Sequence, residues 1–151
     1  MIYQTVWYFS GNQYIGSHRD AQPDEIKKAW GRVRNNIQAN NQIDAVFVTS
    51  DGTTYMFSGD QYIRYSGELK PGDKDFYVDE SYPKKIERWN STENRGTLPD
   101  GFNSGLSAVL TAPDNTIWYF SGNQYTGSRN GAKPGQIKDA WGKVRSNIQV
   151  N

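Results

Sequence analysis

The chain has 151 residues, which is the length of a single domain. Its 17 basic and 16 acidic residues leave a net charge of +1. This near balance excludes a nucleic-acid binder or a polybasic membrane anchor that works by charge alone. Without cysteine there is no disulfide framework, thiolate nucleophile or zinc–thiolate site, and the single histidine, His18, excludes a metal site of several histidines within one chain. Because apolar residues are only 35% of the chain while Trp, Tyr and Phe are 14%, we expect a core built largely from aromatic rings.

No apolar run approaches the roughly 18 residues of a membrane-spanning helix, and Met1 is not followed by the pattern of a secretory signal peptide. We therefore expect a soluble chain with no membrane span, and its cellular location stays open. The partners that remain are a carbohydrate or another small ligand, with no nucleic acid among them.

The first recognisable segment of the chain is repeated near the end of the sequence. Residues 5–38 and 116–149, aligned at an offset of 111, are identical at 23 of 34 positions. Each copy begins with the run WYFSGNQY, which is typical of a strand, a turn containing glycine and a second strand. Apolar residues then recur at spacings of three and four, which predicts a helix over 26–37 and over 137–148.

The middle of the chain holds a weaker third copy. Three segments rich in β-branched and aromatic residues are separated by two turn sequences, which predicts strands over 43–49, 53–57 and 61–65. A shorter helix is predicted over 82–89, with Pro83 in its first turn. Each unit is therefore expected to hold three antiparallel strands and a short helix.

The opening of the middle copy recurs 63 residues later, where residues 106–122 align with 43–59. The sequence thus divides into a truncated unit at 1–42 and complete units at 43–105 and 106–151. Because such a unit cannot bury both faces of its sheet alone, the units are expected to stack side by side around an axis.

The middle unit resembles the hemopexin-like repeat. The likeness lies in the Asp-Ala-Val opening at 44–46, the aromatic strand at 55–57, the Gly-Asp-Gln-Tyr turn at 59–62 followed by Arg64-Tyr65, and the pair Tyr82-Pro83. The first and last units match more loosely, so that the resemblance covers nearly the whole chain. It implies one hemopexin-like domain over 1–151, mainly β, made of β-propeller blades that each have four strands and a short outer helix.

The resemblance also implies a central channel in which backbone carbonyls hold a cation. The positions that open the inner strands are Asp44 and Ser107, with Val46 and Val109 next along the channel. Oxygen donors of this kind suit calcium or sodium. The alternative is a channel that is empty or filled with water.

The sequence departs from the family in two respects. It supplies fewer than three complete blades where the family has four, and it lacks the cysteine pair that often joins the first and last blades. An open stack of blades exposes apolar faces, so we expect the incomplete ring to be completed by self-association into a homo-oligomer. The alternative is that the chain is a piece of a longer array.

The Gly-Asn-Gln-Tyr turns of the first and last units are the candidate ligand sites. Amide side chains form paired hydrogen bonds to sugar hydroxyls, and aromatic rings stack on the C–H faces of sugars. Two weak sites in one chain also add avidity. The alternative is a hairpin turn with a structural tyrosine. The candidate residues are Asn12, Gln13, Tyr14, Asn123, Gln124 and Tyr125.

Two loops hold further candidates. His18 lies in a polar loop and is the candidate axial ligand of a haem, although no second histidine exists for the other face, and the alternative is a solvated loop histidine. An acidic stretch is a candidate for binding calcium or a polyamine, and the alternative is a solvated loop, since its spacing does not fit an EF-hand. Its residues are Asp73, Asp75, Asp79 and Glu80.

No carboxylate pair, phosphate-binding loop or nucleophile elbow is placed by a recognisable motif, so we do not expect an enzyme. The leading hypothesis is a non-catalytic, ligand-binding propeller module that binds carbohydrate as lectins do. One alternative is a haem-, polyamine- or cation-binding protein of the hemopexin type. Another is a structural blade fragment, or an engineered assembly, that has no ligand.

Overall fold

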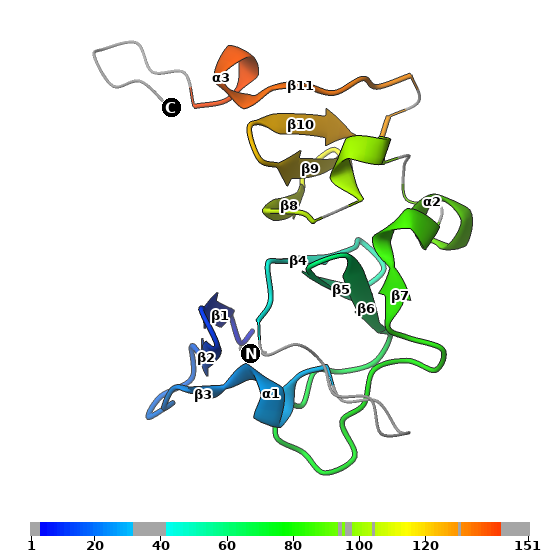
Figure 1. The fold of residues 1–151 in the computed structure, drawn as a ribbon. Helices are drawn as coiled ribbons and strands as arrows, with labels where there is room; N and C mark the ends of the chain where they lie inside the picture. Colours follow the sequence, from blue (N-terminus) through cyan, green and yellow to red (C-terminus); the bar gives the residue numbers. More distant parts are fainter. Residues whose placement is uncertain are drawn as a thin grey trace.

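The computed structural model of the chain describes residues 4–31, 42–93, 95, 98–103, 105–129 and 131–142. Over these residues the protein is mainly β, with three antiparallel sheets and a few short helices (Figure 1). One sheet lies within each of the three sequence units, which are called the first, middle and last units below. No helix in this described part is long and apolar enough to cross a membrane.

The strands of each sheet follow one another in chain order, so that neighbouring strands are neighbours in sequence. The first sheet contains β1 (Trp7–Ser10), β2 (Gln13–Gly16) and β3 (Asp24–Glu25). The middle sheet contains β4 (Ala45–Val48), β5 (Thr54–Ser58), β6 (Gln61–Tyr65) and β7 (Lys84–Lys85). The last sheet contains β8 (Ala108–Thr111), β9 (Ile117–Ser121), β10 (Gln124–Gly127) and β11 (Gly135–Gln136).

The helices are short and follow the last strand of each sheet, apart from η2, which precedes β8. They are α1 (Ile26–Ala29), η1 (Ile86–Arg88), α2 (Trp89–Thr92), η2 (Asp100–Phe102) and α3 (Ile137–Ala140).

The three strands predicted for the middle unit are confirmed as β4, β5 and β6, and their ends shift by no more than two residues. The first turn between them is held by side chains, since the Thr53 amide donates to Asp51 Oδ1 at 3.1 Å and the Thr49 amide donates to the Thr53 carbonyl at 2.9 Å. The second turn contains Gly59 at a φ of +59°, a conformation that glycine adopts without steric cost. The residue pattern missed β7 and its counterparts β3 and β11, because a strand of two residues is too short to show a period.

The two long helices predicted for the first and last units are interrupted after their first turn, at Trp30 and Trp141. After α1 and α3, Trp30 and Trp141 are extended, with ψ of 151° and 149°, and the glycine that follows each has a positive φ. Each tryptophan leaves the helix because its ring packs back onto the sheet of its own unit. The rest of the two predictions, over 32–37 and 143–148, lies outside the described residues.

The helix predicted over 82–89 also starts later than expected. Pro83 precedes β7, and the helical segment begins at Ile86. The Ile86 amide donates to the carbonyl of Asp60 at 2.8 Å, so the hairpin turn after β5 fixes where the helix starts.

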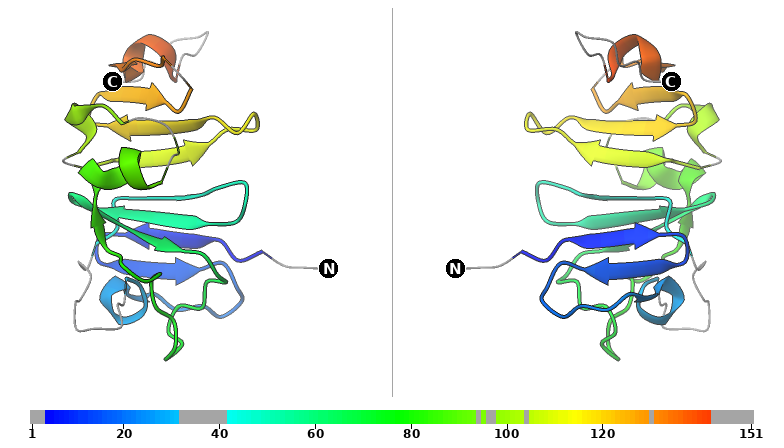
Figure 2. Two further views of the ribbon diagram at one scale, coloured as in Figure 1. Left: turned by 90° about the vertical axis from the view of Figure 1, so that its right-hand side faces the viewer. Right: turned by 90° about the vertical axis from the view of Figure 1, so that its left-hand side faces the viewer.

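The three sheets fan out from a common side, where β4 and β8 lie next to each other, and α1, α2 and α3 lie toward the outer strands (Figure 1). Seen from the side, the last sheet lies at one end, the first sheet at the other, and the middle sheet between them (Figure 2). Each sheet therefore has a front face, turned toward the preceding unit in sequence, and a back face, turned toward the following unit.

A tryptophan occupies the centre of each back face and packs against three rings of its own sheet. The ring centroids are 5.2–5.7 Å apart in the first unit, 4.9–5.2 Å in the middle unit and 5.2–5.9 Å in the last unit. We call these groups aromatic cages, and they make the predicted aromatic core. The cages are Trp30 with Trp7, Phe9 and Tyr14; Trp89 with Tyr55, Phe57 and Tyr62; and Trp141 with Trp118, Phe120 and Tyr125.

The neighbouring unit covers two of the three cages. Tyr65 and Phe76 of the middle unit stack on each other and lie 6.2 and 5.7 Å from the Trp30 ring. Tyr119 of the last unit lies 6.2 Å from Trp89. Both covered tryptophans are therefore fully buried, whereas Trp141 is only half-buried.

Candidate functional site

An open hollow of about 500 Å³ lies where the inner strands of the middle and last units begin. Asp44 and Ser107 line it from equivalent positions, each one residue before the inner strand of its unit. The structure therefore brings together the two residues that the sequence predicts at the opening of a channel, and it adds the turn after β9. The full lining is Gln42, Ile43, Asp44, Gly105, Leu106, Ser107, Ser121 and Gly122.

The side chains of Asp44 and Ser107 hold the hairpin turns beside the hollow. Asp44 Oδ2 accepts a hydrogen bond from the Gly59 amide at 2.7 Å, and Oδ1 accepts one from Gln42 Nε2 at 3.2 Å. Ser107 Oγ accepts a longer bond from the Gly122 amide at 3.4 Å. Both side chains thus hold the turn of their unit by accepting a hydrogen bond from its glycine amide. The bond to Asp44 is the stronger one because a carboxylate is charged.

The donors around the hollow fit a hard cation and do not fit a transition metal. The lining offers carboxylate, hydroxyl and main-chain oxygens, which are the ligands of calcium and sodium. Among the described residues there is no cluster of three or more histidine, aspartate or glutamate side chains that would hold a metal. Val46 and Val109 do not line the hollow, and the Val109 side chain is buried between the sheets.

The Gly-Asn-Gln-Tyr turns have closely similar backbones in the first and last units. Gly11 and Gly122 both have a φ of +58°. The carbonyl of Asn12 accepts a hydrogen bond from the Ile26 amide at 2.8 Å, and that of Asn123 accepts one from the Ile137 amide at 2.9 Å. The backbone of each turn therefore anchors the following helix, while the side chains at the two Asn and two Gln positions are exposed to solvent.

The two candidate tyrosines are less free than the amides. Tyr14 and Tyr125 are half-buried members of the aromatic cages. Burial and the nearby Asp24 carboxylate raise the pKa of Tyr14. Tyr125 belongs to the cage that no other described unit covers. Of the two turns, the one in the last unit thus lies beside the uncovered cage, and its Gly122 also lines the hollow.

His18 lies on the surface of the first unit. Its ring meets the edge of Trp7 at a centroid distance of 6.0 Å and an interplanar angle of 68°. It also crowds Gly16, where a Cβ atom would come within 2.8 Å of His18 Nδ1. The side chain is exposed, and its described contacts are those of a ring resting on the back of β1 and β2.

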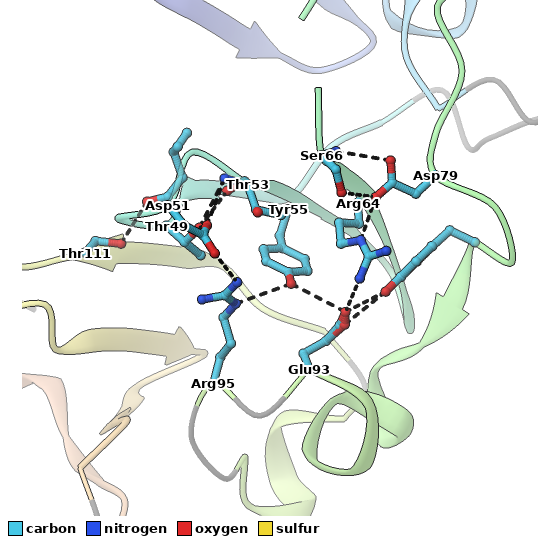
Figure 3. Close-up of polar contacts among 12 residues, drawn as sticks. Thr49, Asp51, Thr53, Tyr55, Arg64, Ser66, Asp79, Glu93, Arg95 and Thr111 are labelled. Atoms are coloured by element: carbon cyan, nitrogen blue, oxygen red, sulfur yellow. Dashed lines mark hydrogen bonds and ion pairs between the residues drawn. The ribbon is translucent and has the colours of Figure 1, made fainter. Parts of the chain in front are cut away.

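The sequence did not predict a polar network beneath the outer strands of the middle unit (Figure 3). Its centre is Glu93, whose side chain is 1% exposed and lies 3.5 Å from Arg64 Nη1. The Tyr82 hydroxyl donates to the same carboxylate, and Arg64 Nε donates to Asp79 Oδ2 at 2.6 Å. Burial and the hydrogen bond to Glu93 raise the pKa of Tyr82. Nothing in the sequence marks Glu93, since its partners come from distant segments.

This network fixes the long loop between β6 and β7. Burial opposes ionisation of Asp79, but hydrogen bonds from Ser66 and from Arg64 outweigh it and lower the pKa of its carboxyl group. The loop fixed in this way also places Phe76 over the cage of the first unit. The network therefore has a structural role, because it holds the loop that joins two units.

A second polar contact joins the middle and last units. The Tyr119 hydroxyl donates to the Arg95 carbonyl at 2.6 Å. Arg95 Nη2 lies 3.1 Å from Asp51 Oδ2 (Figure 3). Arg95 Nε donates to the Tyr55 hydroxyl at 3.3 Å. Together with the packing of β4 beside β8, these bonds fix the last unit against the back face of the middle unit.

The acidic stretch does not form one site. A hollow of about 350 Å³ is lined by Asp73, Asp75 and Asp79 together with Lys70 and aromatic rings, but not by Glu80. The alternative of a solvated loop does not hold for Asp79, which is ion-paired with Arg64.

Comparison with known proteins identifies the family of the middle unit. Residues 43–91 match the family described as Hemopexin. The middle unit is therefore a hemopexin-like repeat. The match covers the middle unit, in agreement with the motifs that carry the resemblance there, and the sequence matches none of the curated proteins with which it was compared.

Solved structures of similar fold extend the likeness to nearly the whole chain. A hemopexin fold protein from cow pea has a TM-score of 0.60 at 19% identity over 91% of this chain and 64% of its own. A plant lectin with two metal binding sites from Cicer arietinum has a TM-score of 0.63 at 17% identity over 99% of this chain and 70% of its own. A plant albumin from Cicer arietinum showing hemagglutination has a TM-score of 0.57 at 18% identity over 93% and 66%. The chain thus has a hemopexin fold and spans about two thirds of the length of these structures.

Proposed function

We propose that this hemopexin-fold protein is a non-catalytic, carbohydrate-binding protein of the lectin type, and that the turns at 11–14 and 122–125 bind the sugar. The observation that carries the proposal is that two near-identical turns present exposed Asn and Gln side chains on a fixed backbone. An amide pair donates and accepts hydrogen bonds at once, which matches the vicinal hydroxyls of a sugar.

The turn of the last unit is the better of the two sites. Tyr125 offers a half-exposed ring beside Asn123 and Gln124, and the neighbouring hollow adds further oxygen and amide groups. A single exposed site of this kind binds weakly, and two turns in one chain raise the avidity for a surface that displays many sugars. The names of a plant lectin and of a hemagglutinating albumin among the proteins of similar fold support this choice.

We further propose that the hollow holds a calcium or sodium ion. Main-chain oxygens at Asp44 and Ser107 would be the ligands, because both side chains already bond to the turns. The ion would supply a fixed positive charge beside the turn at 122–125, where it would orient sugar oxygens.

The test removes the amides of both turns. The double variant Asn12→Ala/Asn123→Ala is compared with wild type on a glycan array and in agglutination, with and without a chelator. The matched control is Gln4→Ala, which removes an exposed amide outside the turns. We expect the double variant to lose binding and the control to keep it. A double variant that binds and agglutinates like wild type rejects the proposal.

Two alternative ligands are tested on the same preparation. A haem-binding protein gives a Soret band with hemin that His18→Ala abolishes, because His18 is the single histidine. A polyamine-binding protein responds to spermine, and the acidic hollow of the middle unit is where that ligand would bind. Either response without glycan binding replaces the carbohydrate proposal.

We also propose that self-association completes the incomplete ring of units. The support is that no described residue of another unit covers the back face of the last unit or the front face of the first unit, where Leu110 and Tyr8 are exposed. In a lectin, association would also place several sugar sites on one particle, which agglutination requires.

A further inference from the structure

The back face of the last unit repeats the back face of the middle unit position by position. In the middle unit five large side chains form this face, and the last unit covers them, so that all are less than 5% exposed. In the last unit the equivalent side chains are half-buried or exposed, and Leu110 is 39% exposed. The middle set is Phe47, Tyr55, Phe57, Tyr62 and Trp89, and the last set is Leu110, Trp118, Phe120, Tyr125 and Trp141.

The front face of the first unit likewise repeats the front face of the last unit. Ile117 and Tyr119 are 7% and 0% exposed, and the Tyr119 ring packs against Phe47 and Trp89 of the middle unit. Their equivalents in the first unit, Val6 and Tyr8, are 49% and 58% exposed. Among the described residues, one copy of each half of this internal interface is therefore left uncovered.

We propose that a second copy of this chain docks its front face at Val6 and Tyr8 on the back face around Leu110 and Trp141, and so repeats between molecules the contact between the middle and last units. This inference rests on the self-association proposed above and names the two surfaces. The repeat favours a second copy of the chain as the partner. The front face of its first unit is free, and it resembles the front face of the last unit, which already packs on the back face of the middle unit. The front faces of its middle and last units are covered and cannot dock in this way.

The contact between molecules is smaller than the contact within the chain. Within the chain, β8 lies beside β4 as well as on the back face. In the first unit, β1 is an edge strand, and the described residues contain no further strand beyond it that would correspond to β8. The packing of β8 beside β4 therefore has no counterpart between molecules. The contact between two molecules is therefore weaker than the contact between the middle and last units of one chain, and association depends on protein concentration. It is also head-to-tail, so the two surfaces are different and can be blocked separately.

The experiment uses one variant for each surface. Tyr8→Arg blocks the front face and Leu110→Arg blocks the back face, and each position is exposed enough to accept an arginine without loss of core packing. The matched control is Val48→Arg, which replaces another half-exposed apolar side chain outside both surfaces. Mass is measured by light scattering over a wide range of concentration, and circular dichroism checks that each variant is folded.

We expect the mass of wild type and of the control to rise with concentration, and each blocked variant to stay a monomer. An equal mixture of the two blocked variants should form a dimer and nothing larger, because the mixture restores one free front face and one free back face. A wild type that is monomeric throughout, a blocked variant that still associates, or a mixture that stays monomeric overturns the inference. Glycan binding by immobilised monomer is independent of these outcomes, so failure here leaves the sugar site standing.

Discussion

The first and last units have nearly the same sequence in their repeated segments and yet bury opposite faces. Trp30 is 1% exposed, whereas its counterpart Trp141 is half-buried. On the other face, Tyr119 is fully buried, whereas its counterpart Tyr8 is 58% exposed. Local sequence therefore sets which side chains point to which face, and the neighbouring unit decides whether that face is buried.

The reason lies in how little a sheet of three or four short strands can bury by itself. Each aromatic cage covers one side of its tryptophan, and a second layer must cover the other. For Trp30 this layer is the loop that presents Phe76, which the Arg64–Asp79–Glu93 network holds in place. For Trp141 no described residue of another unit provides it.

Removing the two tryptophans gives the largest expected difference. Trp30→Ala should destabilise the protein by about 3–5 kcal/mol, because it leaves a cavity between two units. Trp141→Ala should cost about 1–2 kcal/mol, because water already reaches that face. The measurement is urea unfolding of both variants in the Leu110→Arg background, which keeps the chain monomeric. Equal losses would mean that the two cages are equally covered.

Substitutions of two glycines test the same difference between the first and last units, with smaller expected effects on stability. A Cβ atom at Gly16 would lie 2.7 Å from the Trp7 ring, and one at Gly127 would lie 2.8 Å from the Trp118 ring. Trp7 is held by Trp30 beneath the middle unit, so Gly16→Ala should cost about 1–3 kcal/mol through overpacking. Trp118 can shift toward solvent, so Gly127→Ala should cost less than about 1 kcal/mol. Thermal unfolding of the two variants compares them, and a larger loss for Gly127→Ala would contradict the difference in cover.

The smallest effect comes from two tyrosine hydroxyls. Tyr119→Phe removes the hydrogen bond to the Arg95 carbonyl and should cost about 1 kcal/mol. Tyr8→Phe removes an exposed hydroxyl and should change stability by no more than about 0.5 kcal/mol. Urea unfolding measures both, and a cost for Tyr8→Phe that equals the cost for Tyr119→Phe would show that the front face of the first unit is already covered.

Much of the local structure can be predicted from the sequence, because strands, turns and repeats leave local patterns. The strands of the middle unit and the glycine turns lie where residue type and spacing place them. The helix ends do not, because Trp30 and Trp141 satisfy a helical pattern and yet leave the helix to pack on their sheets. The spacing of apolar residues cannot show whether a tryptophan continues the helix or packs on the sheet.

The candidate site divides in the same way. The sequence pairs Asp44 with Ser107 through the repeat, and the structure places both around one hollow. The sequence also singles out the amides of the turns, and the structure shows that they are exposed, as a ligand site requires. The sequence does not indicate that Val109 is buried, or that Glu93 and Arg64 form the network that fixes the middle loop.

By itself the sequence determined the number of repeated units, the alternation of side chains on each strand and the turns that join the strands. These follow from chemistry within a few residues. Only the tertiary structure decided which cage is sealed, which tyrosine is buried and which faces stay open. Those outcomes depend on apolar area that a second unit removes from water, and no unit encodes the presence of its neighbour.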